Sequence, residues 1–136
     1  MIDYRTGNNL DLDEVIELYR SCSLGERRPV AEKDRFAAMM KHANLVLTAW
    51  DGDLLVGIAR SFTDFSYITY MADLAVRESH QKQGIGRELV RLTQEQGGPK
   101  TGIVLLAAPA AEKYYGRIGF TYMNNAWFLR GGDKLL

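Results

Sequence analysis

The sequence predicts an α/β fold of the α+β kind, with a mixed, mostly antiparallel sheet flanked by about four helices. Two strand-like runs, Leu45–Trp50 and Leu54–Phe62, are joined through Asp51-Gly52-Asp53, a composition typical of a hairpin turn. Farther along, the apolar run Met71–Val76 passes through a glycine-containing loop into an amphipathic helix, and another short apolar run follows. A hairpin beside a strand–helix–strand unit gives a sheet with both pairing directions.

The first third of the chain is predicted to form a short strand and two helices. The strand covers Ile2–Arg5, and Asp11 can cap the helix that follows, because an acceptor side chain there satisfies the first free N–H groups. The second helix is expected at about Ala31–Ala43. Between the helices, Cys22–Pro29 is expected to be a solvated loop.

The second half is predicted to alternate between strands and helices. The helix after the glycine loop should end at about Gln96, because Gly97-Gly98-Pro99 follows and proline cannot continue a helix. Strands are expected at Tyr67–Val76 and Ile103–Ala107, and a helix at Pro109–Ile118. Phe120–Leu129 is expected to form a final strand or pair of strands.

Length and composition favour one compact domain over residues 1–136. Apolar residues make up 46% of the chain, and 17 basic residues balance 17 acidic ones, which argues against nucleic-acid or anionic-membrane partners. The single cysteine, Cys22, suits a reducing compartment, and the sequence has neither a membrane-length apolar run nor a signal-like start. We therefore expect a cytoplasmic protein. No residues have the spacing of a metal site.

The glycine loop is the strongest functional signal. Gly84 and Gly86 stand where a strand passes into a helix N-terminus, whose free N–H groups and dipole attract phosphate or pyrophosphate. Such glycine pairs also occur in ordinary tight turns, so this alternative stays open. Leu89 stands where the dinucleotide fingerprint needs a third small residue, which disfavours a Rossmann site.

Two segments together resemble the GNAT superfamily of acetyl-CoA-dependent N-acetyltransferases. Gln81–Gly86, preceded by Asp73–Val76, is similar to motif A of that family. Ala111–Phe120 resembles motif B, in which a tyrosine stands four residues before Gly-Phe. The resemblance implies acetyl-CoA as co-substrate and the GNAT fold over nearly the whole chain.

The resemblance also implies which residues contact coenzyme A. Backbone groups of one strand would face the pantetheine arm, namely Leu74, Ala75 and Val76. Backbone amides of the loop would surround the pyrophosphate, namely Gln81, Lys82, Gln83, Gly84, Ile85 and Gly86. The side chains of Lys82 and Arg87 could add attraction for phosphate, or could simply be solvated cations. Family members often carry an asparagine after the next strand, where this chain has Ala107-Ala108-Pro109-Ala110.

Two residues are candidates for catalysis. Tyr115 matches the general-acid position of the family, with a purely structural role as the alternative. Asp73 is an acid inside an apolar strand, so it is either a satisfied structural carboxylate or a residue that deprotonates or holds the amine. His80 is expected to be a packing or surface residue. Several aromatic residues could line an acceptor pocket or belong to the core: Phe62, Phe65, Tyr67, Tyr70 and Trp127.

The sequence is compatible with three functions. The first is direct acetyl transfer from acetyl-CoA to a primary amine of a small molecule. The second is a catalytically inactive acyl-CoA-binding module that serves as a sensor or assembly subunit. The third is a nucleotide-binding domain of another fold. A homodimer is possible if the segment Ala126–Arg130 pairs with a neighbour's sheet edge.

Overall fold

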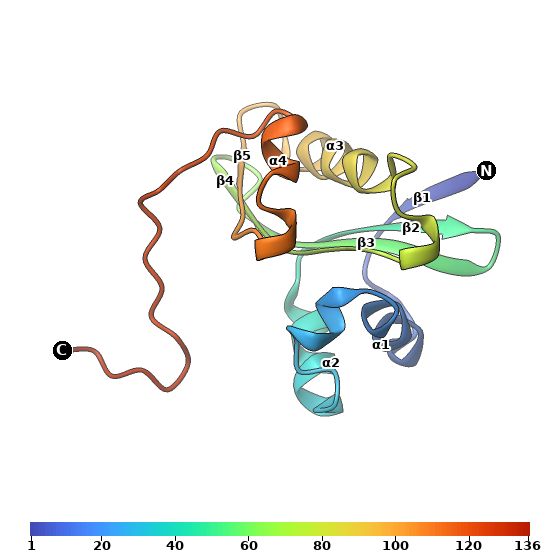
Figure 1. Ribbon diagram of the computed structural model, residues 1–136, viewed down its shortest axis with the longest axis horizontal. Coiled ribbons are helices and arrows are strands. Elements are labelled where there is room, and N and C mark those ends of the chain that lie inside the picture. Colours follow the sequence, from blue (N-terminus) through green and yellow to red (C-terminus); the bar gives the residue numbers. More distant parts are fainter. The chain divides into compact units, whose positions relative to one another are not determined.

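The computed structural model describes all residues, 1–136, and divides into two compact units, Met1–Leu106 and Ala107–Leu136. The first unit contains the sheet and the three longer helices (Figure 1). None of the helices combines the length and the apolar character that a membrane span requires. The expectation of a single domain over residues 1–136 stays a prediction.

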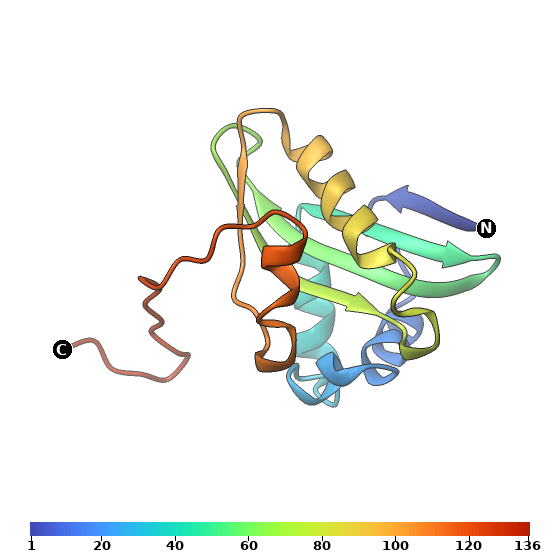
Figure 2. The same ribbon diagram turned by 45° about the horizontal axis from the view of Figure 1, so that its top comes forward.

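The sheet has five strands in the order β1-β2-β3-β4-β5. The first four pair antiparallel and β5 lies parallel to β4, so the predicted mixed, mostly antiparallel sheet is confirmed (Figure 2). The strands span Ile2–Thr6, Leu45–Asp51, Leu54–Thr63, Ile68–Val76 and Gly102–Val104.

Helices cover both faces of this sheet. α1 (Leu12–Arg20) and α2 (Lys33–His42) lie on one face, and α3 (Ile85–Gly97) crosses the other (Figures 1 and 2). α3 approaches β3 so closely at Gly57 that a Cβ there would lie 3.0 Å from Leu89 Cδ1. A short 3₁₀ helix, η1, connects α1 and α2 over Ser23–Glu26.

The apolar core cluster lies between the sheet and the α1–α2 pair. Tyr19 of α1 and Phe36 of α2 are fully buried there and meet edge to face, with ring centroids 5.0 Å apart. Aromatic contacts of this kind add stabilisation beyond the area that they bury. Asp11 caps α1 as predicted, because its side chain accepts a hydrogen bond from the Asp13 N–H at 2.9 Å.

β4 contains a bulge and has β5 beside it over its first three residues only. Arg60 pairs with Asp73 but Ser61 pairs with Met71, so Ala72 is the extra residue on β4. The last pair with β5 joins Tyr70 to Val104. From residue 71 to residue 76, the edge of β4 that points away from β3 therefore has no strand beside it. We call this edge the open edge.

The second unit differs from the prediction. The expected helix Pro109–Ile118 forms as two short pieces, η3 (Pro109–Ala111) and α4 (Tyr114–Arg117). The expected strand over Phe120–Leu129 does not form. A strand exists only where a neighbour takes up its backbone hydrogen bonds, and the sheet includes no strand beyond β5. The other predicted elements are confirmed to within a few residues.

Candidate functional site

The open edge exposes the backbone of alternate residues. The N–H of Arg77 donates to Val56 O of β3 at 2.8 Å, so the carbonyl of the same peptide, Val76 O, points the other way. By the alternation of an extended strand, the N–H and C=O of Leu74 and the C=O of Ala72 also point to the open edge. This edge is therefore a row of hydrogen-bonding groups.

Side chains occupy the two ends of this row. At one end, Gln81 Nε2 donates to Val76 O at 2.9 Å. At the other, Arg28 Nη2 donates to Ala72 O at 2.9 Å. Leu74 lies between them, and its N–H and C=O are the groups that a ligand in extended conformation could bind. The side chain of Ala75 instead points into the core and is 2% exposed.

The loop from β4 to α3 has a backbone shape that few residues adopt. Lys82 and Gly84 both have positive φ, at 63° and 83°. Gly84 is the N-cap of α3, and no side chain caps the first turn of that helix. The first N–H groups of α3 are thus available to an anion, and the helix dipole favours negative charge at the same place.

Solvent exposure differs between the loop and the first residue of α3. Residues 81–84 are exposed, whereas Ile85 is 2% exposed and fixes the start of α3 against the sheet. The side chains of Lys82 and Arg87 are both exposed. The structure thus brings the whole predicted phosphate segment together at one helix N-terminus.

Three contacts anchor this loop to its surroundings. His80 Nε2 lies 2.9 Å from Asp51 Oδ2 in the β2–β3 hairpin, which is a structural contact. That hydrogen bond lowers the pKa of Asp51 below its ordinary value. Arg77 forms a bidentate pair with Glu17 of α1, at 2.7 and 2.6 Å. The third contact is the bond from Gln81 to Val76 O.

Asp73 is the centre of a buried polar cluster. Its side chain is fully buried, and it accepts hydrogen bonds from Tyr19 Oη at 2.7 Å, Arg28 Nε at 2.6 Å and Arg60 Nε at 2.6 Å. These donors come from α1, from the loop before α2 and from β3. Burial, and then the negative charge of Asp73, raise the pKa of Tyr19 well above its ordinary value, so its hydroxyl stays a donor.

These contacts bear on the two alternatives for Asp73. Two guanidinium groups and a hydroxyl already occupy acceptor positions on both oxygens of this buried carboxylate. The geometry favours the satisfied structural carboxylate. No sequence pattern marks Tyr19, Arg28 or Arg60 as partners of Asp73, which lies 54, 45 and 13 residues from them in the chain. The only signal was the acid itself, which cannot be buried without partners.

Tyr115 lies in α4 of the second unit. Its ring meets Tyr114 and Phe120 edge to face, with centroid distances of 5.2 and 5.4 Å. Burial, and then the neighbouring Tyr114, raise the pKa of its hydroxyl above the ordinary value. The hydroxyl is therefore fully protonated at neutral pH, as a proton donor must be.

The candidate acceptor-pocket aromatics are largely exposed. Phe62 and Tyr70 are direct cross-strand partners on β3 and β4, and they are 36% and 38% exposed. Phe65 and Tyr67, in the turn that joins these strands, are also exposed. In the second unit, Trp127 is 94% exposed. None of these side chains belongs to the buried core.

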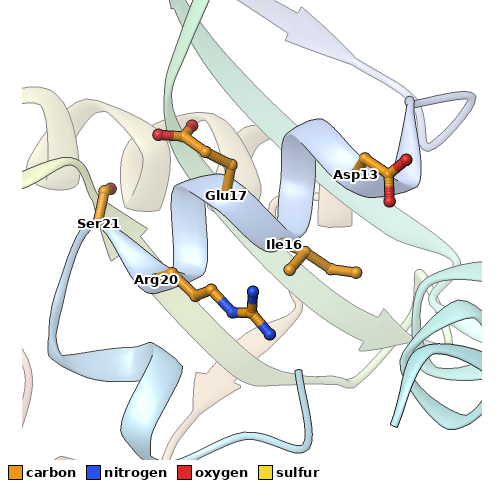
Figure 3. Close-up of a pocket in the computed structure, with 5 residues that line it drawn as sticks. All are labelled: Asp13, Ile16, Glu17, Arg20 and Ser21. Atoms are coloured by element: carbon orange, nitrogen blue, oxygen red, sulfur yellow. The ribbon is translucent and has the colours of Figure 1, made fainter. Parts of the chain in front are cut away.

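One surface pocket lies elsewhere, along α1 (Figure 3). Its lining combines acidic, basic and apolar side chains: Asp13, Ile16, Glu17, Arg20 and Ser21. Glu17 is already paired with Arg77, and Asp13 pairs with Lys33 at 2.7 Å. The pocket contains none of the residues that the sequence predicted for function.

Comparison with known proteins gives a consistent result. The family model described as acetyltransferase (GNAT) domain matches residues 25–132. A GNAT-family acetyltransferase from Streptococcus pneumoniae is similar in structure, with a TM-score of 0.69 at 23% identity over 96% of this chain and 99% of that one. No curated protein matches the sequence.

An aminoglycoside N-acetyltransferase, AAC(6′)-Iy, is similar as well. Its complex with CoA has a TM-score of 0.73 at 16% identity, over 96% of this chain and 94% of that one. Its complex with a bisubstrate analogue, CoA-S-monomethyl-acetylneamine, has a TM-score of 0.70 at 16% identity, over 96% and 97% of the two chains. At these identities the likeness concerns the fold.

Proposed function

This chain belongs to the GNAT acetyltransferase family, and from that premise we propose that it transfers the acetyl group of acetyl-CoA directly to a primary amine of a small molecule. The observation that carries the proposal is that the first unit contains both an uncapped α3 N-terminus and the open edge of β4. The first suits the pyrophosphate of coenzyme A, and the second suits the amides of its pantetheine arm.

The residues present fit coenzyme A. The N–H groups at the start of α3 and the positive φ of Gly84 suit a pyrophosphate, because backbone and anion can approach closely there. Lys82 and Arg87 are exposed beside this loop and would add charge attraction. Leu74 would exchange hydrogen bonds with the pantetheine arm, much as a strand pairs with its neighbour. Acetyl-CoA supplies the thioester that the amine attacks.

Tyr115 is proposed as the general acid. The thiol of coenzyme A has an ordinary pKa of about 8.5 and a phenol one of about 10, so full proton transfer from tyrosine to thiolate is uphill. The raised pKa of Tyr115 makes the transfer harder but keeps the hydroxyl protonated. Its contribution is then a hydrogen bond to sulfur as negative charge develops there.

The amine must lose a proton before it attacks. An alkylammonium has an ordinary pKa of about 10, so only a small fraction is reactive at neutral pH. A role for Asp73 as base stays a prediction, and its three hydrogen bonds favour the structural alternative. Solvent water is the alternative acceptor of that proton.

A small-molecule acceptor is proposed on two grounds. The bisubstrate complex of a protein with the same fold contains an aminoglycoside portion, which is a small amine. In this chain, the exposed pair Phe62 and Tyr70 gives the β3–β4 hairpin an aromatic surface that an apolar or aromatic amine would contact. An acceptor screen should therefore include an aminoglycoside, a polyamine and an arylalkylamine.

The first test is a thermal-shift titration with acetyl-CoA, CoA, ATP and NAD. A ligand at a hundred times its Kd stabilises a protein by about 2.7 kcal/mol, which gives a shift of several degrees. We expect a shift with the two CoA species only. A shift with ATP or NAD instead would contradict the proposed site.

The second test is the variant Tyr115→Phe. Thiol release with a saturating amine should fall by about tenfold or more, because general acids contribute at least that much, while the CoA-induced thermal shift is retained. Tyr122→Phe, an exposed tyrosine of the same unit, is the matched control. Wild-type rates in Tyr115→Phe would remove Tyr115 from the mechanism. CoA binding without turnover of any amine in the wild type would instead favour the acyl-CoA-binding module.

A further inference from the structure

We propose that Arg28 is a positioning residue for acetyl transfer, which holds the bulge of β4 so that the N–H of Leu74 points out from the open edge. The inference rests on the proposed function, since Leu74 lies on the edge assigned there to the pantetheine arm. It adds that the N–H of Leu74 donates to the thioester carbonyl at the end of that arm. Arg28 reaches this place from the loop between η1 and α2, part of a segment whose sequence predicts a solvated connection.

The guanidinium of Arg28 contacts two consecutive residues of β4. Its Nε donates to Asp73 Oδ1 at 2.6 Å, and its Nη2 donates to Ala72 O at 2.9 Å. Its Nη1 donates to Arg27 O at 2.8 Å, which holds the group against its own loop. One planar group thus fixes the peptide between Ala72 and Asp73, and the next peptide carries the N–H of Leu74.

The bulge is the part of β4 that needs such support. Ala72 is the extra residue between two registers, so it has no register partner on β3. The carboxylate of Asp73 is held from its other oxygen, Oδ2, by Tyr19 and Arg60. Arg28 completes this arrangement because it links the carboxylate of Asp73 to the carbonyl of Ala72 in the bulge.

Charge balance indicates that Arg28 does more than neutralise Asp73. The side chain of Arg60 is 7% exposed and that of Asp73 is fully buried, so these two already form a buried ion pair. Arg28 is a second cation for a single anion, and its side chain is 25% exposed. A partly exposed second guanidinium is not needed to compensate the carboxylate. The contact that only Arg28 provides is the one with Ala72 O.

The variant Arg28→Lys separates the two roles. Lysine keeps the positive charge near Asp73, but a single ammonium lacks the planar fork that spans the carboxylate and the carbonyl. Arg27→Lys is the matched control, because Arg27 lies next to it in the same loop and its side chain is exposed. Both variants are compared with the wild-type full chain in melting temperature, in affinity for CoA, and in kcat and KM with the best amine of the screen.

A spectroscopic measurement reports on the acyl group itself. The carbonyl carbon of bound [1-¹³C]acetyl-CoA shifts when a hydrogen bond polarises it, and this shift needs no amine. For Arg28→Lys we expect near wild-type melting temperature and CoA affinity, kcat lowered about tenfold or more, and a carbonyl signal closer to that of free acetyl-CoA. Arg27→Lys should match the wild type in all of these.

The other outcomes contradict the inference. Equal kcat and equal carbonyl shift in Arg28→Lys and Arg27→Lys would show that Arg28 acts as a structural cation. A lower kcat with an unchanged carbonyl shift would overturn the positioning role as well. Absence of CoA binding by the wild type is a separate result, which contradicts the proposed function before any variant is compared.

Discussion

The two ends of the open edge of β4 are built by different means. At the bulge, four side chains from four parts of the chain converge: Tyr19, Arg28, Arg60 and Asp73. At the other end, the loop into α3 presents mainly backbone, and its shape depends on Gly84 and on the helix that follows. The first end depends on the identity of distant residues, and the second on local conformation. Substitutions should therefore affect the two ends differently.

The largest expected effect is at the bulge. Asp73→Asn removes the anion between two guanidinium groups and leaves Arg60 buried without its partner. Breaking a buried ion pair costs about 3 kcal/mol or more in the free energy of unfolding. Denaturant unfolding should show this loss for Asp73→Asn and almost none for Asp3→Asn, an exposed aspartate on β1. Equal stability of the two variants would mean that the cluster does not hold this end of the edge.

A smaller effect on stability is expected at the glycine loop. Gly84→Ala places a Cβ where φ is 83°, which costs about 1–2 kcal/mol although the space around it is open. Gly52→Ala, at φ 59° in the β2–β3 hairpin and equally open, is the matched control. Both should lose similar stability, but only Gly84→Ala should weaken CoA binding in isothermal titration. Unchanged CoA affinity in Gly84→Ala would separate this loop from the ligand.

The smallest effect on stability is expected at the contact between His80 and Asp51, and it depends on pH. The hydrogen bond from His80 lowers the pKa of Asp51 in the folded state, so the unfolded state binds its proton more tightly. The stabilisation from this contact is present above the ordinary pKa of aspartate and disappears as pH falls through the lowered value. Asp51→Asn should therefore lower the melting temperature slightly at neutral pH, and the difference from the wild type should shrink as pH falls through the lowered pKa of Asp51.

The neighbouring variant Asp53→Asn is the control for this measurement. It changes a charge in the same hairpin turn but not the contact with His80. A pH dependence that is identical in the two variants would show that the anchor from the hairpin to the loop contributes nothing measurable. The comparison of the two ends would then rest on the bulge alone.

The glycine loop could be predicted because its signals are local. Strand, glycines and amphipathic helix follow one another between Met71 and about Gln96, and each restricts the backbone where it stands. For the same reason, the predicted ranges of the strands of the first unit and of three helices agree with the structure to within a few residues. The strand expected over Phe120–Leu129 was wrong because an apolar pattern provides a side-chain surface but no partner for the backbone.

The cluster at Asp73 could not be predicted from the same signals. Its donors lie far away in the sequence, and arginines in a helix-connecting loop ordinarily remain in solvent. The bulge was equally invisible, since no residue type marks Ala72 as the extra one on β4. Only the register between β3 and β4 decides which residue of β4 has no partner on β3.

The family, the element order of the first unit and the glycine loop before α3 follow from the sequence, because they depend on patterns of neighbouring residues. The burial of Asp73 between two guanidinium groups and the contact of Arg28 with the backbone of Ala72 are visible only in the folded chain. Burial and long-range hydrogen bonds arise only when the strands and helices pack, and packing selects among partners that the sequence leaves equivalent.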